Sequence, residues 1–265
     1  MSRSVLTALF AALICTGCSA AVRTDHYAVA QGFEKTVVEG AGFRHVVYLN
    51  RRAEDSGEAL NVYIEGDGAP WILRRFVAKN PTSANTLMLH LMAQDSAPAL
   101  YLGRPCYFGL HQDAGCDPKY WSSDRYSAAV VNSMAAALAR VAPGREVNLF
   151  GHSGGGALAV LLAARVSRVK AVVTLAGNLD PDAWTRRHRY EPLRGSLNPS
   201  LQPPLPSTIA QYHLAGGGDK NVDTESIEAF ARGQPGAVFR LYPEQRHVCC
   251  WETVWPEILG NLSQK

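Results

Sequence analysis

The chain has 265 residues, of which 47% are hydrophobic and 18% are charged, a composition that supports one sizeable hydrophobic core. Its formal net charge of +3 at pH 7 is too small to indicate a nucleic-acid partner. Beyond the N-terminus, no stretch of the sequence is long and apolar enough to span a bilayer.

The N-terminus has the pattern of a targeting segment. Arg3 supplies a short positive region, and residues 5–14 form an apolar core of the length found in signal peptides. We therefore expect residues 1–17 to be a signal peptide and the mature protein to be exported.

Cys18 follows small residues in a pattern that resembles the lipobox of bacterial lipoproteins, in which the cysteine is lipidated and becomes the mature N-terminus. Cys15 departs from that motif, because it stands where the lipobox usually has leucine. Ser19 follows Cys18 in place of an aspartate, and the resemblance then implies a lipid anchor in the outer membrane, facing the periplasm. The alternative is cleavage after Ala20 or Ala21, which gives a soluble periplasmic or secreted protein.

Behind the signal peptide, residues 18–42 are expected to form a tether and N-terminal segment, of which residues 21–31 are mobile. Residues 43–265 are expected to be a single α/β domain. Its predicted strands cover residues 43–49, 60–64, 99–102, 146–150, 169–175, 208–214 and 237–242. Its predicted helices cover residues 86–94, 126–141, 157–166, 222–232 and 252–262. Because strands alternate with helices, the sheet should be mostly parallel.

Two connections in this domain have their own patterns. Residues 51–58 are polar and indicate a hairpin turn. Residues 179–206 are rich in proline and break the alternation of strands and helices, which predicts a cap-like insertion over the site. The insertion contains a basic cluster, in which a solvated loop is a commoner reading than an anion site. The members of this cluster are Arg186, Arg187, His188 and Arg189.

The motif Gly151-His152-Ser153-Gly154-Gly155 fits the G-x-S-x-G nucleophile elbow. An apolar strand precedes the motif and an apolar helix pattern follows it, as such an elbow requires. The sharp turn between strand and helix lifts the serine Oγ clear of the sheet, and glycines are needed because the turn leaves no room for Cβ atoms. We therefore predict Ser153 to be a nucleophile.

A serine hydroxyl is a weak nucleophile at neutral pH, and it needs a base that is itself held by a third group. Behind an elbow of this kind, the acid and then the histidine follow the serine along the chain. Asp219 follows the predicted strand 208–214, and His247 follows the predicted strand 237–242, so both fall at the same edge of the sheet as Ser153. We predict that Ser153, Asp219 and His247 form a catalytic triad.

Other acids and histidines fit these roles less well. Asp180 follows the strand after the elbow and is the alternative acid. Asp223 stands near the start of a helix, where an aspartate is more often a cap. His152 lies inside the elbow, and its side chain is expected to pack away from the base.

The oxyanion of a tetrahedral intermediate needs two hydrogen-bond donors. The backbone N–H of Gly154 is the first candidate, because it lies at the start of the elbow helix. The second is expected from the loop Gly66-Asp67-Gly68, directly after the strand 60–64. The sequence does not distinguish Asp67 from Gly68 as this donor.

Export makes the remaining cysteines candidates for disulfide bonds. Cys106 and Cys116 bracket a loop rich in Gly, Pro and Asp, and we predict a bridge between them that stabilises the fold by about 2–3 kcal/mol. Cys249 and Cys250 are adjacent and close to His247, and they are open to pairing with each other, pairing with the loop cysteines, or remaining reduced. A zinc site is not indicated, because no C-x-x-C motif with partner histidines is present.

The elbow and the order of elements over residues 43–262 resemble the α/β-hydrolase superfamily, and within it the serine esterases and lipases. The resemblance implies a mostly parallel central sheet flanked by helices, and acyl transfer from a carboxylic ester or thioester to water. Ser153 attacks, His247 shuttles the proton and Asp219 holds the imidazole. Neither a metal nor an organic cofactor is implied.

Two alternative functions remain open at this point: a non-catalytic envelope lipoprotein that uses the fold as a binding scaffold, and an acyltransferase. The expected partners are a small-molecule or lipid ester and, through the anchor, a membrane, while the oligomeric state is open. Trp71, Trp121 and Trp184 are candidates for the wall of an acyl pocket.

Overall fold

The computed structural model describes residues 20–53, 58–83 and 85–263. The predicted signal peptide and the predicted lipidation of Cys18 lie outside these residues. None of the helices in the described ranges has the length and hydropathy of a membrane span.

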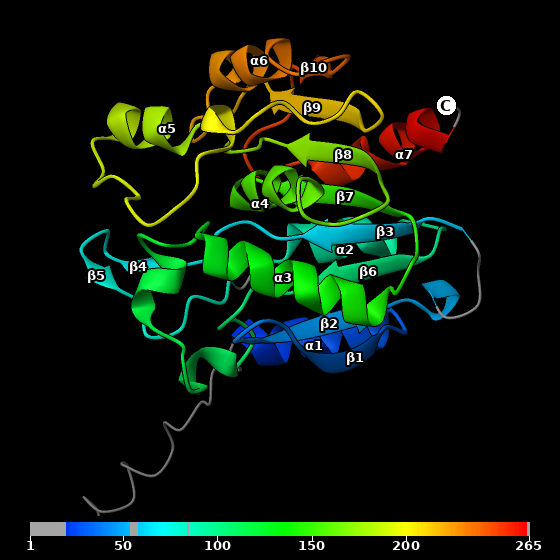
Figure 1. Ribbon diagram of the computed structural model, residues 1–265, viewed down its shortest axis with the longest axis vertical. Helices are drawn as coiled ribbons and strands as arrows, with labels where there is room; N and C mark the ends of the chain where they lie inside the picture. The colour runs from blue at the N-terminus through cyan, green and yellow to red at the C-terminus, as the bar shows by residue number, and fades with distance from the viewer. Residues whose placement is uncertain (1–19, 54–57, 84, 264–265) are drawn as a thin grey trace, which may run out of the picture.

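An eight-stranded sheet forms the centre of the molecule (Figure 1), with the strand order β1-β2-β6-β3-β7-β8-β9-β10. The strands are β1 (Glu34–Glu39), β2 (Arg44–Leu49), β3 (Leu60–Ile64), β6 (Ala99–Leu102), β7 (Val147–His152), β8 (Val169–Leu175), β9 (Ala210–Gly216) and β10 (Val238–Tyr242). β2 runs antiparallel to both of its neighbours, and every pairing from β6 through β3 to β10 is parallel. The sheet is therefore mostly parallel, as the sequence predicts.

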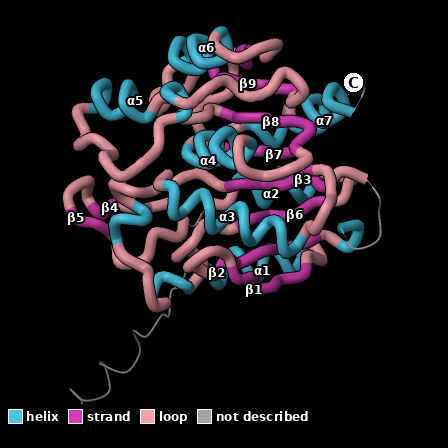
Figure 2. Tube along the Cα trace, in the orientation of Figure 1, coloured by secondary structure: helices cyan, strands magenta, loops and turns pink. Residues whose placement is uncertain are grey.

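Helices cover both faces of the sheet (Figure 2). One core lies under α3 (Ala128–Val141), α4 (Gly154–Ala163) and α6 (Thr224–Arg232). The other lies under α1 (Ala20–Ala30), α2 (Leu87–Ala93) and α7 (Trp255–Ser263). The central strands are apolar on both sides because both sides are covered, and all five residues of β3 are buried.

The remaining elements are short and lie in the connections. Single-turn helices occur at η1 (Arg51–Ala53), η2 (Leu110–Gln112), η3 (Pro118–Trp121), η4 (Pro199–Leu201) and η5 (Trp251–Thr253). The segment between β8 and β9 contains α5 (Pro181–His188), and the segment between β3 and α2 contains a hairpin of β4 (Trp71–Ile72) and β5 (Phe76–Val77). The sequence did not indicate α5, β1 or this hairpin.

The prediction that residues 21–31 form a mobile tether is wrong, because most of them belong to α1. This helix packs against the sheet and buries Thr24 and Ala28. The Tyr48 hydroxyl donates a hydrogen bond of 2.5 Å to Asp25, which also pairs with Lys35 at 2.8 Å. Only a narrow stripe of this helix is buried. Its hydrophobic periodicity is therefore too weak to predict the helix from the sequence.

The prediction of a hairpin turn at residues 51–58 is also wrong. β6 lies between β2 and β3 in the sheet, so the two strands that flank this segment are not neighbours. Polar composition indicates a surface connection, but it does not show whether the two strands that the connection joins are neighbours in the sheet.

Cys106 and Cys116 form the predicted disulfide, with their Cα atoms 5.7 Å apart. The bridge closes the loop behind β6 that leads to η3. The structure also pairs Cys249 with Cys250, one of the arrangements that the sequence left open.

Candidate active site

Ser153 occupies the sharp turn between β7 and α4, at the carboxyl edge of the sheet. Its backbone φ of 53° lies in the left-handed region that side-chain-bearing residues rarely adopt. The turn is held by hydrogen bonds from the Ser153 N–H to Leu175 O, at 3.0 Å, and from the Asn178 N–H to Ser153 O, at 2.9 Å. A Cβ atom on Gly151 would collide with the backbone of Gly155, which explains the glycine there.

The structure brings the three predicted triad residues together. The Oγ of Ser153 lies 3.0 Å from Nε2 of His247, and Nδ1 of His247 lies 2.8 Å from Oδ2 of Asp219. The other oxygen of Asp219 accepts hydrogen bonds from the N–H groups of Asn221, at 2.7 Å, and Val222, at 3.0 Å. Those bonds fix the carboxylate, so that Oδ2 remains available to orient the imidazole.

The environment of His247 favours its neutral form. Burial lowers the pKa of the imidazole, the hydrogen bond that the ring donates to Asp219 raises it, and the nearby His152 lowers it, with a net result below the ordinary 6.5. The ring donates from Nδ1 to the Asp219 carboxylate, which leaves the Nε2 lone pair directed to the Ser153 hydroxyl. His247 is therefore able to accept a proton at neutral pH.

Asn221 is a second neighbour of the His247 imidazole, and the sequence gave no signal for this contact. Its Nδ2 lies 2.9 Å from Nε2 of His247, and its Oδ1 accepts a hydrogen bond of 3.4 Å from Nε1 of Trp184. The Trp184 contact fixes the amide with its N–H side toward the imidazole. A donor at Nε2 supports the neutral histidine and opposes protonation.

The loop after β3 passes directly over the elbow. A Cβ atom on Gly66 would lie 3.3 Å from the Cβ of Ser153, whereas one on Gly68 would meet Pro81 and the Tyr107 ring. Gly66 therefore packs against the elbow, and the N–H groups of Asp67 and Gly68 both remain candidates for the second oxyanion donor. The N–H of Gly154, in the first turn of α4, has no partner within its helix and stays the first proposed donor.

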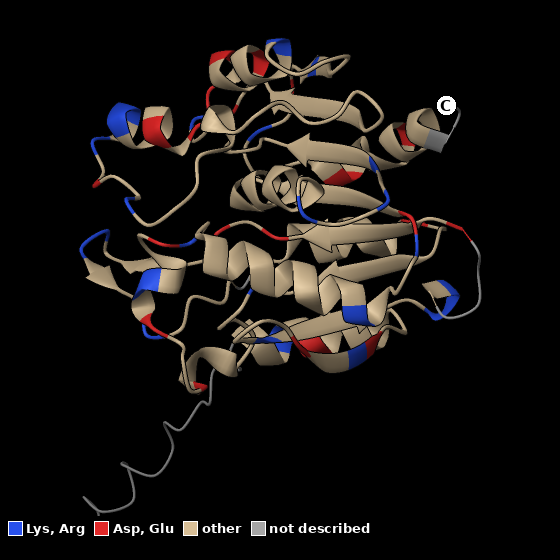
Figure 3. Cartoon of the chain, in the orientation of Figure 1, with Lys and Arg blue, Asp and Glu red and all other residues tan. Residues whose placement is uncertain are grey.

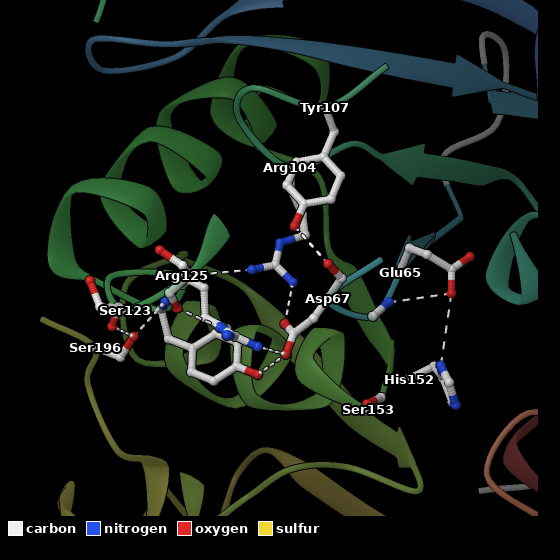
Figure 4. A network of polar contacts seen from close by, with 12 residues as sticks. Glu65, Asp67, Arg104, Tyr107, Ser123, Arg125, His152, Ser153 and Ser196 are labelled. Carbon is white, nitrogen blue, oxygen red and sulfur yellow. Dashed lines mark hydrogen bonds and ion pairs between the residues drawn. The ribbon is translucent and has the colours of Figure 1, made fainter. Parts of the chain in front are cut away.

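The side chain of Asp67 is the centre of a buried polar network (Figure 4). Its carboxylate pairs with Arg104 at 2.6 Å and Arg125 at 2.8 Å, and it accepts a hydrogen bond of 2.7 Å from the Tyr126 hydroxyl. The Tyr107 hydroxyl donates to the backbone oxygen of Asp67 at 2.8 Å. Burial alone would raise the pKa of the carboxyl, but the guanidinium charges of Arg125 and Arg104 outweigh it and hold the pKa well below its usual range. The network therefore holds an ionised aspartate, and the loop after β3 with it, in one position.

Glu65 fastens the loop from its other side. Its Oε2 accepts a hydrogen bond of 3.0 Å from the N–H of Met88 in the first turn of α2, and its Oε1 lies 3.8 Å from Nδ1 of His152. His152 in turn reaches the backbone oxygen of His247 through Nε2, at 2.6 Å. The prediction that His152 packs away from the base is thus wrong, because its ring lies 4.9 Å from that of His247.

The competing aspartates have structural partners instead of catalytic ones. Asp180 accepts a hydrogen bond from Ala183 N at the start of α5, at 3.0 Å, and another from Asn198. Asp223 caps α6 by accepting from Ser226 N at 2.9 Å. Neither carboxylate is bonded to His247.

A cavity of about 650 Å³ opens in front of Ser153 and His247. Its apolar wall includes Leu87, Leu193, Val248 and two of the three candidate tryptophans, Trp71 and Trp184. Trp121 does not line the cavity: it is buried, and its Nε1 donates to Ala78 O at 2.9 Å.

Cationic side chains from the insertion and from the β4–β5 hairpin also reach this cavity. Of the basic cluster in the insertion, Arg189 lines the cavity, whereas Arg187 pairs with Asp223 at 3.3 Å. Arg74 and Arg75, from the β4–β5 hairpin, line it as well. Within the described ranges, no group of three or more His, Cys, Asp or Glu side chains is arranged to hold a metal ion.

Comparisons with known proteins agree with this architecture. Residues 107–192, which include the elbow, match a family described as alpha/beta hydrolase fold. A search of curated proteins found no match to the sequence. Among solved structures, Est1E from Butyrivibrio proteoclasticus is 13% identical with a TM-score of 0.62, over 87% of this chain and 99% of its own.

Two further solved structures match to a similar degree. A thermophilic esterase from Thermogutta terrifontis is 13% identical with a TM-score of 0.57, over 87% of this chain and 98% of its own. A membrane phospholipase A, described as a bacterial virulence factor, is 16% identical with a TM-score of 0.58, over 92% of this chain and 91% of its own. The chain has the α/β-hydrolase fold, and the predicted fold class is confirmed.

Proposed function

We propose that the protein is a serine hydrolase that cleaves a carboxylic ester or thioester through an acyl-enzyme on Ser153. The observation that carries the proposal is the continuous hydrogen-bonded chain from the Ser153 hydroxyl through His247 to Asp219, at the wall of an open cavity. A hydroxyl, a neutral imidazole and an orienting carboxylate in this order are the groups that nucleophilic acyl transfer requires.

The proposed reaction passes through a tetrahedral intermediate and an acyl-enzyme. Nε2 of His247 takes the hydroxyl proton as Oγ of Ser153 bonds to the carbonyl carbon, and the N–H of Gly154, with that of Asp67 or Gly68, stabilises the oxyanion. When the tetrahedral intermediate collapses, the bond to the alcohol or thiol breaks and His247 returns the proton to the leaving group. Water then attacks the acyl-enzyme with His247 as its base, and the carboxylic acid leaves as Ser153 is regenerated.

The cavity supports an ester with an apolar acyl part. Its volume of about 650 Å³ falls within the range of ordinary small-molecule sites. Trp71, Trp184 and Leu193 supply apolar surface, and the segment 179–206 contributes the last two of these residues as a cap over the site. The likeness to an esterase and a phospholipase at the level of the fold agrees with this class of substrate but does not select a member of it.

The proposal is tested by a Ser153→Ala variant assayed with nitrophenyl acyl esters. Turnover should vanish while the circular dichroism spectrum and melting temperature stay close to those of the parent. Full activity in this variant would refute the proposal. A fluorophosphonate probe separates a hydrolase from a non-catalytic scaffold, because a scaffold without an activated serine stays unlabelled.

An acyltransferase would share the triad and the acyl-enzyme. Product analysis with competing alcohols distinguishes the two reactions: a hydrolase releases the free acid as its main product, whereas an acyltransferase forms a new ester.

A further inference from the structure

The β4–β5 hairpin exposes a row of large apolar side chains to solvent. Five of the twelve exposed large hydrophobic side chains in the described part of the chain fall within residues 71–77. They are Trp71, Ile72, Leu73, Phe76 and Val77, and the fractions exposed at Ile72, Leu73 and Phe76 are 53%, 86% and 57%. A cluster of this kind on a soluble domain marks an interaction site more often than a folding requirement.

The turn of the hairpin does not explain its own sequence. Leu73 and Arg74 both have positive φ, at 51° and 56°, and the Arg75 N–H donates to Ile72 O at 3.1 Å to close the turn. Turns with two such residues normally use Asn-Gly, because other side chains are disfavoured in the left-handed region. Within the described part of the chain, Leu73 therefore meets neither a packing need nor a conformational preference.

The charge around this apolar row has one sign. Arg74, Arg75 and Lys79 are exposed, and no acidic residue occurs over 68–83. The Arg75 guanidinium lies 5.5 Å from the centre of the Phe76 ring, so cations and apolar groups are interleaved at the tip. Two copies of the chain joined through this hairpin would bring cations against cations, whereas an anionic lipid surface offers apolar depth and negative phosphates together.

The hairpin also stands at the mouth of the cavity. Trp71, Arg74 and Arg75 line the space in front of Ser153. The hairpin and α5 lie at the same end of the sheet (Figure 1), and both contain Lys or Arg residues (Figure 3). A surface that bound the hairpin would lie next to the opening of the site.

We propose that the β4–β5 hairpin is a membrane-docking surface, which inserts Leu73 and Phe76 into the interface of an anionic phospholipid bilayer while Arg74 and Arg75 bind lipid phosphates. This surface goes beyond the proposed hydrolase activity and does not depend on it. Membrane contact through this surface is confined to the hairpin, so it can be measured separately from binding through any anchor that the N-terminus provides.

The direct test is hydrogen–deuterium exchange of the full chain carrying Ser153→Ala, which prevents hydrolysis of the lipid. Vesicles of phosphatidylcholine alone are compared with vesicles that also contain phosphatidylglycerol. The amides of residues 71–77 should exchange several-fold more slowly with the anionic vesicles than in solution. Because this readout is confined to the hairpin, unchanged exchange there would overturn the proposal even if the chain binds the vesicles by its N-terminus.

Matched variants supply the second readout. Leu73→Ser with Phe76→Ser should abolish the local protection and weaken vesicle binding at least tenfold. The control, Val29→Ser with Leu241→Ser, removes two apolar side chains that are exposed elsewhere, at 70% and 45%, and should change neither quantity. Arg74→Gln with Arg75→Gln should weaken binding to anionic vesicles by about thirtyfold, since each arginine near such a surface contributes about 1 kcal/mol, and should have little effect on neutral vesicles.

Two further results would refute the docking proposal. Hairpin protection in the control but also in the Leu73→Ser, Phe76→Ser variant would refute the proposal. So would a conversion of dimers to monomers by that variant, measured by sedimentation, with vesicle binding unchanged. Hydrolysis of a dissolved short-chain ester should stay at the parent level in the Leu73→Ser, Phe76→Ser protein, because neither side chain lines the cavity. A parent protein without any esterase activity would refute the proposed function and leave the docking result standing.

Discussion

Replacing Asp67 by asparagine tests whether the buried ionic network around this residue stabilises the fold. The substitution keeps the size of the side chain but removes the charge that Arg104 and Arg125 share. These two arginine side chains are only 2% and 4% exposed, so solvent does not compensate for the loss. Breaking a buried ion pair by neutralising one partner typically costs about 3–5 kcal/mol.

In a domain of this size, each kcal/mol shifts the melting temperature by about 2–4 °C. We therefore expect Asp67→Asn to lower the melting temperature by about 6–20 °C, measured by calorimetry or circular dichroism at neutral pH. The matched control is Glu146→Gln, which removes the exposed pairs with Arg168 and Lys170 and should cost less than about 1 kcal/mol.

The difference in stability between the parent and Asp67→Asn should depend on pH in one direction. Because the pKa of Asp67 is depressed in the folded protein, its contribution is fully present above the pKa of an unfolded aspartate, about 3.9, and is lost as the pH falls below it. The gap in stability between the parent and Asp67→Asn should therefore narrow in acid. Equal melting temperatures of the parent and Asp67→Asn at neutral pH would show that the charge of Asp67 does not stabilise the fold. A difference in stability that widens as the pH falls below about 4 would show the same.

Three further predictions follow from the site and the loop. Asp219→Asn should reduce kcat by about 10³–10⁴-fold with little change in stability, since the imidazole loses its orienting carboxylate; activity near the parent level would exclude Asp219 as the acid. The parent's activity should rise with pH through the pKa of His247, which lies below 6.5. Asn221→Ala should move that rise to higher pH, because it removes a donor that opposes protonation of Nε2. A shift to lower pH in a pH–rate profile would contradict the assigned orientation of the Asn221 amide. Cys106→Ser with Cys116→Ser should lower the free energy of unfolding by about 2–3 kcal/mol in urea titrations, and an unchanged midpoint would show that the closed loop contributes nothing.

The central part of the fold was predictable because its signals are local. The apolar runs of β3 and β8 reflect burial on both faces, and the glycines around Ser153 report a turn without room for Cβ atoms. The positions of Asp219 and His247 followed from strand order, because parallel strands end at one edge of the sheet.

The features that the sequence did not reveal depend on long-range contacts or on very short elements. Arg104 and Arg125 lie 37 and 58 residues from Asp67 along the chain, and no periodicity links these positions. Asn221 is fixed only by the joint placement of Trp184 and His247. The β4–β5 hairpin consists of two-residue strands, which are too short for an alternating pattern to register.

Trapping the acyl-enzyme is the most direct test of whether Ser153 carries the acyl group. The protein is mixed with a nitrophenyl acyl ester, quenched in acid while turnover proceeds, and digested for peptide mass mapping. We expect an added acyl group on the peptide that contains Ser153, which disappears as the ester is consumed and is absent from Ser153→Ala. Sustained ester turnover with the acyl group on another residue, or with no acylated peptide at any time, would contradict the account.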